Sequence, residues 1–123
     1  MFGLDVQNTT VAEAVEWIVR RARRRQKTQL NFVNAHCINT ASRDLEYYRA
    51  LRASDRLLPD GSGIGLAMRM QGTGLIANLN GTDLFPHLCH AAASQGLSLF
   101  LLGAQPGVIP HVEVNGCGST ALC

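Results

Sequence analysis

One stretch, DRLLPDGSGIG from Asp55 to Gly65, constrains the fold of this chain more than any other. Its two leucines are predicted to end a buried strand, because the proline that follows lacks the amide that a central strand needs. Asp60 is then presented at the carboxyl edge of the strand, which is where α/β folds place their chemistry. The glycines after it allow a ligand to approach the backbone closely. A helix expected from Ile64 to Met70 would point its amino end at the same space, as a site for the diphosphate of a nucleotide.

The composition is that of one folded domain. Hydrophobic residues make up 46% of the 123 residues and charged residues 16%, which excludes a disordered chain. A net charge of +2 is too small to indicate a nucleic-acid partner, and we expect none. The basic residues are concentrated from Arg20 to Lys27. They are interpreted either as a solvated face at a helix C-terminus or as a patch that rests on anionic lipid headgroups.

The cysteines do not form the closely spaced pairs of a zinc site, so we expect no metal, and we expect reduced thiols in the cytoplasm. No stretch has the pattern of a signal peptide. The longest uninterrupted apolar run, Leu99 to Leu102, is far shorter than the roughly 20 residues that cross a bilayer. Any membrane contact is therefore expected to be peripheral.

Helical patterns are expected in two places in the first half of the chain. Thr10 and Glu13 have the spacing of a capping box, which opens an amphipathic helix running to about Arg25. The pattern from Cys37 to Ala53 is expected to break near Asp44, which would cap its second piece. The residues expected to face inward from that piece are Leu45, Tyr48 and Leu51.

Strands are expected between the helices. Met1 to Val6 has the length of a short edge strand, and Gln29 to Asn34 is a predicted strand. After the central turn, Thr82 or Asp83 is expected to cap a further helix. Leu97 to Leu102 is then the most convincing strand, because it is a short apolar run bounded by glycines. This alternation predicts a parallel sheet with right-handed crossovers.

The candidate site residues follow strands or open helices, and in a parallel sheet all such positions face one edge. They are Asn34, Asp60, Gly61, Ser62, Gly63, Gly81, Thr82, Asp83, and Gly103, Gln105, Pro106 and Gly107 of a second glycine-rich loop. An aspartate without a histidine partner suits a general base that takes a proton from a sugar hydroxyl, while glycine loops and helix amino ends hold a diphosphate leaving group. The alternative is that Asp60 only caps the helix after it.

Several common enzyme classes are excluded by missing motifs. Leu66 stands where the third glycine of a dinucleotide fingerprint would be, so we reject a nicotinamide and expect no cofactor. The chain has no GxxxxGK phosphate loop, no HExxH helix and no GxSxG turn. His36 and His87 each stand alone, and a lone histidine is more often a surface residue than a catalytic one.

Four segments of the chain form a pattern together: NFVNAHCINTASRD, ASDRLLPDGSGIGLAMR, LNGTDLFPHLC and GLSLFLLGAQPGV. In the same order and at similar spacing, they resemble the WecG/TagA/CpsF family of bacterial glycosyltransferases, over about Gly3 to Val108. The resemblance implies an α/β fold of the Rossmann-like kind, with a parallel sheet and helices on both faces. It also implies a metal-independent, inverting transfer of an N-acetylmannosamine-like sugar or related hexose. The donor would be a UDP-sugar and the acceptor a polyprenyl-diphosphate-linked saccharide at the inner membrane face.

The resemblance also implies roles for residues. Asp60 would be the base and Asn34 would line the same pocket, while the segments 81–83 and 103–107 would be pocket and donor-binding elements. Two positions depart from better-known members, because Phe32 stands in place of a threonine and Asn78 in place of an arginine. We interpret these departures as a subfamily difference of an exopolysaccharide-synthesis type.

The family pattern is expected to stop after Val108. Residues 1–108 would then be the N-terminal portion of one domain, incomplete at its C-terminal side, and residues 109–123 an aberrant tail produced by a frame change or an early stop. A non-catalytic remnant, acting at most as a nucleotide-binding or interaction module, is the alternative function. A small unrelated α/β binding domain is the third interpretation, and it requires Asp60 to be only a helix cap.

Overall fold

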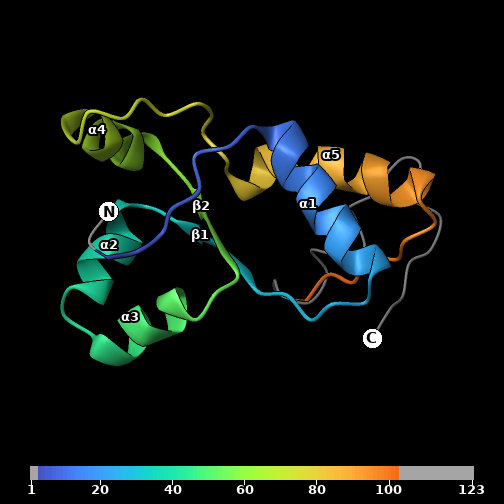
Figure 1. Ribbon diagram of the computed structural model, residues 1–123, viewed down its shortest axis with the longest axis horizontal. Helices are drawn as coiled ribbons and strands as arrows, with labels where there is room; N and C mark the ends of the chain where they lie inside the picture. Colours follow the sequence, from blue (N-terminus) through green and yellow to red (C-terminus); the bar gives the residue numbers. More distant parts are fainter. Residues whose placement is uncertain (1–2, 103–123) are drawn as a thin grey trace, which may run out of the picture.

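The computed structural model describes residues 3–102, which form an α/β fold (Figure 1). Its elements in chain order are α1 (Val11–Arg23), β1 (Leu30–Val33), α2 (Ala35–Ala41), α3 (Leu45–Arg52), β2 (Arg56–Pro59), α4 (Ser62–Met70) and α5 (Gly81–Ser94). The predicted α/β class is therefore confirmed, with a strand before Asp60 and a helix after it.

The sheet of the described residues consists of two parallel strands. In its register Leu30 of β1 pairs with Arg56 of β2, and Val33 pairs with Pro59. Pro59 is the last residue of β2 and is fully buried, so the proline ends the strand as predicted. The expected edge strand before α1 is reduced to one isolated parallel bridge, between Val6 and Leu57.

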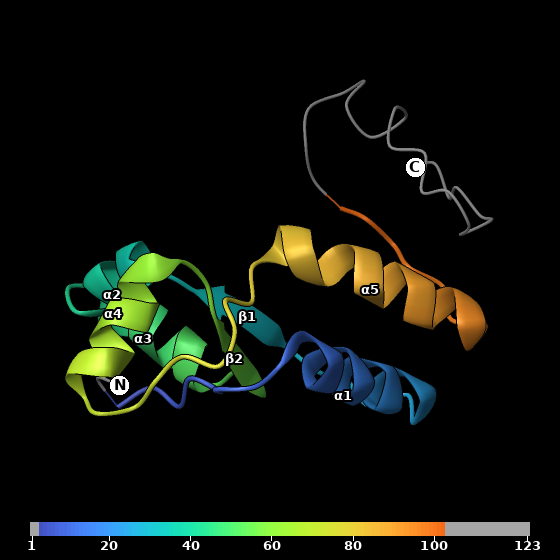
Figure 2. The ribbon, with the colours of Figure 1, turned by 90° about the horizontal axis from the view of Figure 1, so that it is seen from above.

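The adjacent leucines of β2 point to opposite faces of the sheet, because side chains alternate along a strand. Leu57 packs in one hydrophobic cluster with Val33 and with residues of α2, α3 and α4. Leu58 packs in a second cluster with residues of α1 and α5. Figure 2 shows the sheet between these two groups of helices. The prediction of helices on both faces is confirmed.

Local capping explains where two of the predicted helices begin. The Thr10 hydroxyl accepts a hydrogen bond from the Glu13 amide, and the Glu13 carboxylate accepts one from the Thr10 amide. This reciprocal pair is the predicted capping box of α1. Asp44 caps α3 as expected, because its carboxylate accepts bonds from the amides of Glu46 and Tyr47.

The start of α5 corrects a prediction. Its N-cap is Asn80, rather than Thr82 or Asp83, since the Asn80 side-chain oxygen accepts from the Asp83 amide at 2.7 Å. The Asn80 side-chain nitrogen in turn donates to the Asp83 carboxylate at 2.8 Å. The helix therefore begins at Gly81, because the residue that accepts the amide hydrogen bond of its first turn is Asn80, which precedes the expected caps in the chain.

The segment from Leu97 to Leu102 is not a strand, so that prediction is wrong. Phe100 is 64% exposed and Leu102 is 92% exposed, so these apolar side chains are not buried against the sheet. A strand forms only where a neighbour completes its backbone hydrogen bonds, and an apolar run does not encode that neighbour. Leu45, which was expected to face inward from α3, is also exposed, whereas Leu51 is buried.

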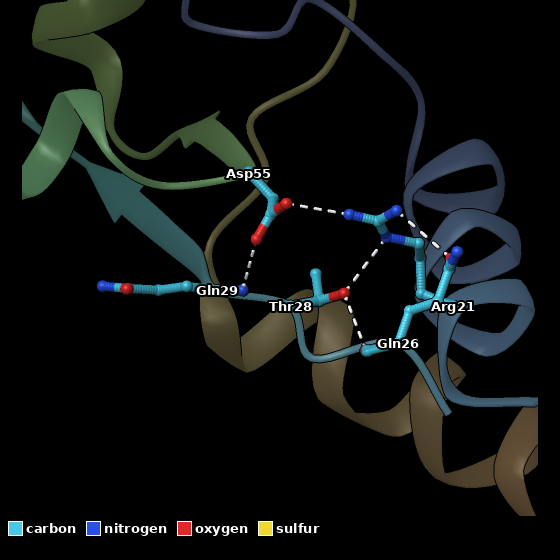
Figure 3. Close-up of polar contacts among 5 residues, drawn as sticks. All are labelled: Arg21, Gln26, Thr28, Gln29 and Asp55. Carbon is cyan, nitrogen blue, oxygen red and sulfur yellow. Dashed lines mark hydrogen bonds and ion pairs between the residues drawn. The ribbon is translucent and has the colours of Figure 1, made fainter. Parts of the chain in front are cut away.

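An ion pair ties α1 to the amino edge of the sheet (Figure 3). The Arg21 guanidinium lies 2.8 Å from one carboxylate oxygen of Asp55, whose other oxygen accepts from the Gln29 amide at 2.9 Å. Arg21 also donates to the side chains of Gln26 and Thr28. Asp55 precedes β2 and Asp60 follows it, so this contact lies at the opposite edge of the sheet from Asp60.

Candidate functional site

The two residues predicted at strand ends lie at one edge of the sheet. Val33 pairs with Pro59, so Asn34 and Asp60 follow directly after paired positions of β1 and β2. The Asp60 amide donates to the carbonyl oxygen of Val33 at 2.9 Å, which holds the two strand ends together. The structure thus brings Asn34 and Asp60 side by side.

The side chain of Asp60 is half-buried and has no protein partner in the described part of the chain. It makes no hydrogen bond or ion pair with any residue in the range 3–102. The N-cap of α4 is Gly61, which has a φ of 91°, and no side chain caps that helix. The alternative in which Asp60 only caps α4 is therefore wrong. Its carboxylate is available to a ligand.

The first turn of α4 differs from those of the other helices within residues 3–102. Each of the others begins with a side-chain cap, provided in chain order by Thr10, Asn34, Asp44 and Asn80. The first amides of α4, which belong to Ser62 and Gly63, have no side-chain acceptor, and both residues are exposed. A helix start of this kind attracts anions, because its amides and its dipole present positive charge.

Asn34 has a structural role beside this helix start. Its side-chain oxygen accepts a hydrogen bond from the Cys37 amide at 3.0 Å and so caps α2. The starts of α2 and α4 lie close together, since a Cβ atom at Gly63 would lie 3.0 Å from the Cβ atom of Ala35. A glycine at position 63 therefore lets the two helix starts approach.

Asn78 belongs to this site and was not among the predicted site residues. Its side-chain oxygen accepts a hydrogen bond from the Gly61 amide at 2.6 Å. The Leu79 amide donates to the carbonyl oxygen of Pro59 at 2.9 Å. The segment between α4 and α5 therefore runs against the turn that carries Asp60. In the sequence, this position stands out only because the resemblance implies an arginine where the chain has asparagine.

The start of α5 lies at the same edge, over β1. A Cβ atom at Gly81 would lie 3.8 Å from the ring of Phe32. Thr82 and Asp83 are exposed on this first turn, but the Asp83 carboxylate is engaged by the Asn80 side chain. The predicted loop residues Gly103, Gln105, Pro106 and Gly107 lie outside the described residues.

Two shifted pKa values belong to helix capping and packing. Hydrogen bonds from the Thr10 amide and from the Thr9 and Thr10 hydroxyls lower the pKa of Glu13. Hydrogen bonding with the neighbouring Cys37 thiol, and then burial, raise the pKa of Tyr47. Within residues 3–102, no group of three or more His, Cys, Asp or Glu side chains is arranged to hold a metal ion. No helix in that range is long and apolar enough to span a bilayer.

The fold and the site together define an α/β protein whose helix starts gather at the carboxyl edge of a parallel sheet, an arrangement typical of nucleotide-binding domains. Comparison with known proteins identifies the family within this class. The model of the glycosyl transferase WecG/TagA/CpsF family matches residues 1–116, so the chain belongs to that family. The match extends beyond Val108.

A relative from Bacillus subtilis (strain 168) is named N-acetylglucosaminyldiphosphoundecaprenol N-acetyl-beta-D-mannosaminyltransferase. The chain is 31% identical to it over 83 residues, which make up 68% of this chain. The matched part spans 32% of the relative, so the chain corresponds to a minor part of that protein.

Proposed function

We propose that this chain carries the donor and base residues of a glycosyltransferase. The donor is a UDP-sugar that carries N-acetylmannosamine or a related hexose, and the acceptor is a saccharide linked to polyprenyl diphosphate. Membership of the WecG/TagA/CpsF family supports the reaction type, and the name of the Bacillus relative supports the sugar and the kind of acceptor. The product would serve cell-surface polysaccharide synthesis.

One observation supports this function best: among residues 3–102, a carboxylate without a protein partner stands directly before a helix start without a side-chain cap. Asp60 supplies the carboxylate, and the amides of Ser62 and Gly63 open the helix. Transfer from a UDP-sugar needs both features, because one group must accept a proton while another stabilises the charge that grows on the diphosphate.

The chemistry follows from this placement. The ionised Asp60 carboxylate takes the proton from the acceptor hydroxyl as the hydroxyl oxygen attacks the anomeric carbon of the sugar. The bond from that carbon to the diphosphate oxygen breaks, and its electron pair leaves with UDP toward the amides of α4. A single displacement inverts the anomeric configuration. The charge on the leaving group is offset here by backbone amides, and we propose a reaction without a metal.

We also propose that the protein acts at the cytoplasmic side of the membrane through a peripheral contact. The acceptor sugar stays tied to its lipid through the diphosphate, so the edge of the sheet that carries Asp60 must face the bilayer. The basic residues from Arg20 to Lys27 lie on the last turn of α1 and directly after it, at the opposite edge of the sheet, where Arg21 already pairs with Asp55. This placement supports the interpretation of these basic residues as a solvated face.

The first prediction tests the base. The chain is incubated with UDP-N-acetylmannosamine and a polyprenyl-diphosphate-linked N-acetylglucosamine acceptor, and turnover is compared between the wild type, Asp60→Asn and Asp5→Asn. Asp5 is exposed and bonds only to Gln7 among the described residues, so the control removes the same charge away from the site. We expect Asp60→Asn to lower turnover by about 100-fold or more, because general bases contribute rate factors of this size.

Binding of UDP, measured by calorimetry, completes this test. The two variants are expected to bind UDP as tightly as the wild type, because Asp60 acts on the acceptor hydroxyl. Unchanged turnover in Asp60→Asn would remove the base assignment. A wild-type chain that binds UDP but transfers no sugar would favour the alternative of a non-catalytic nucleotide-binding module.

A further inference from the structure

We propose that Asn78 is a positioning residue for Asp60, an inference that rests on the proposed function. The Asn78 side-chain oxygen accepts the Gly61 amide hydrogen at 2.6 Å, at the turn between β2 and α4. Asn78 comes from the segment that joins α4 to α5, so a residue distant in the chain controls the peptide directly after the base. It acts through Gly61 and not on the reacting atoms.

The backbone around Asp60 is held at three consecutive residues. The Pro59 carbonyl accepts from the Leu79 amide at 2.9 Å, and the Asp60 amide donates to the Val33 carbonyl at 2.9 Å. Both bonds join main-chain groups, so no side-chain atom takes part in them. The third bond, from the Gly61 amide, is the one that depends on a side chain. Asn78 therefore fixes the peptide plane between Asp60 and Gly61, and with it the direction of the Asp60 side chain.

The same bond decides which amides of α4 remain open. The Gly61 amide is occupied by Asn78, so an anion at this helix start meets the amides from Ser62 onward. Gly61 has a φ of 91°, and without a side chain it adopts other backbone conformations readily. A bond to Asn78 therefore holds a residue that would otherwise be free to turn.

A second asparagine, Asn8, holds the same segment between α4 and α5. It therefore tests whether Asn78 only stabilises that segment or also positions Asp60. The Asn8 side chain donates to the Gly74 carbonyl at 2.7 Å and accepts from the Ile76 amide at 2.8 Å. Leu79, fully buried, anchors the segment as well. Asn78 itself is exposed, so the segment stays docked without it. Asn8 thus provides the matched control, because it holds the segment without contacting the turn at Asp60.

The experiment compares Asn78→Ala, Asn78→Asp and Asn8→Ala in the full chain. Hydrogen exchange of the Gly61 amide reports the bond itself, and steady-state kinetics report turnover and the KM for the UDP-sugar. We expect Asn78→Ala to speed exchange at Gly61 and to lower kcat by about 10-fold with an unchanged KM, because misplacement of a reacting group costs rate. Asn8→Ala should leave the exchange at Gly61 and kcat as in the wild type.

The Asn78→Asp variant separates positioning from direct contact with substrate. Its carboxylate keeps an acceptor for the Gly61 amide at the same reach, so exchange and kcat should return to nearly wild-type values. Its added charge beside the diphosphate should raise the KM for the donor. An Asn78→Asp variant as slow as Asn78→Ala, or an Asn78→Ala variant with unchanged kcat, would overturn the positioning role alone. Absence of transfer by the wild type would instead overturn the proposed function.

Discussion

Among single residues of the site, Gly61 adopts a backbone conformation that requires glycine. Its φ of 91° and ψ of 159° belong to a region that only glycine adopts readily. A Cβ atom there would meet no atom within 4 Å, so backbone strain and not collision sets the cost of a side chain. We expect Gly61→Ala to lower the free energy of unfolding by about 1–3 kcal/mol, measured by urea denaturation.

Gly74→Ala is the control for this prediction. A Cβ atom at Gly74 would also meet nothing within 4 Å, and its φ lies outside the positive region. The substitution should leave the stability unchanged or raise it by up to about 1 kcal/mol, because alanine restricts the unfolded chain. Equal losses at the two positions would show that backbone strain at Gly61 is not the cause.

The residues of the site were predictable where a general rule applies to them. Asn34 and Asp60 were placed correctly because side chains directly after parallel strands share one edge of the sheet. Asn78 was not predictable, since its contact with Gly61 joins positions 17 residues apart and has no local pattern. The sequence also did not decide whether the Asp60 carboxylate caps α4, because an aspartate before a helix has the same sequence pattern in either case.

Among the elements, α1 carries a charge whose effect on stability depends on pH. The hydrogen bonds of the capping box hold the pKa of Glu13 below its ordinary value of 4.5. Folding therefore favours the ionised carboxylate. The stabilisation that the ionised Glu13 carboxylate gives to the folded state is complete above the unfolded-state pKa. It is lost as the pH falls through the lower folded-state pKa.

We expect the difference in the free energy of unfolding between the wild type and Glu13→Gln to be constant near neutral pH and to close below pH 4.5. Urea denaturation at a series of pH values measures it. Glu16→Gln removes the same charge from the same helix without a capping contact, and it serves as the control. A difference that is independent of pH would contradict the capping-box contribution.

Helix starts were more predictable than strands because their signals are local. The spacing of Thr10 and Glu13 was sufficient for α1, and Asp44 for α3. At α5 the sequence Asn80-Gly-Thr-Asp contains several residues that could cap the helix. Asn80 is the cap because its side chain reaches the Asp83 amide in the folded chain, which the sequence alone does not reveal. The strand expected at Leu97 to Leu102 failed because pairing requires a partner that the run itself does not specify.

For the whole molecule, β2 links two hydrophobic clusters on opposite faces of the sheet. Leu57 belongs to one cluster, while α1, with the single tryptophan Trp17, packs on the other face. We expect Leu57→Ala to lower the free energy of unfolding by about 2–5 kcal/mol. Because the faces share one strand, the fluorescence of Trp17 should report this loss although Trp17 lies across the sheet.

Leu66→Ala is the control for this substitution, because Leu66 is 61% exposed on α4. It should change the stability by less than about 0.5 kcal/mol. If Leu57→Ala does not change the unfolding midpoint measured by Trp17 fluorescence, the two faces of the sheet unfold independently.

The central claim is that the start of α4 beside Asp60 receives the diphosphate of the donor, and the most direct test is a titration of the ¹⁵N-labelled chain with UDP. Amide resonances of Ser62 and Gly63 should move as UDP is added, because no side chain of residues 3–102 accepts from these amides. Those of Glu46 and Tyr47, which Asp44 already caps, should stay in place. Shifts confined to other helix starts, or none at saturating UDP, would contradict the claim.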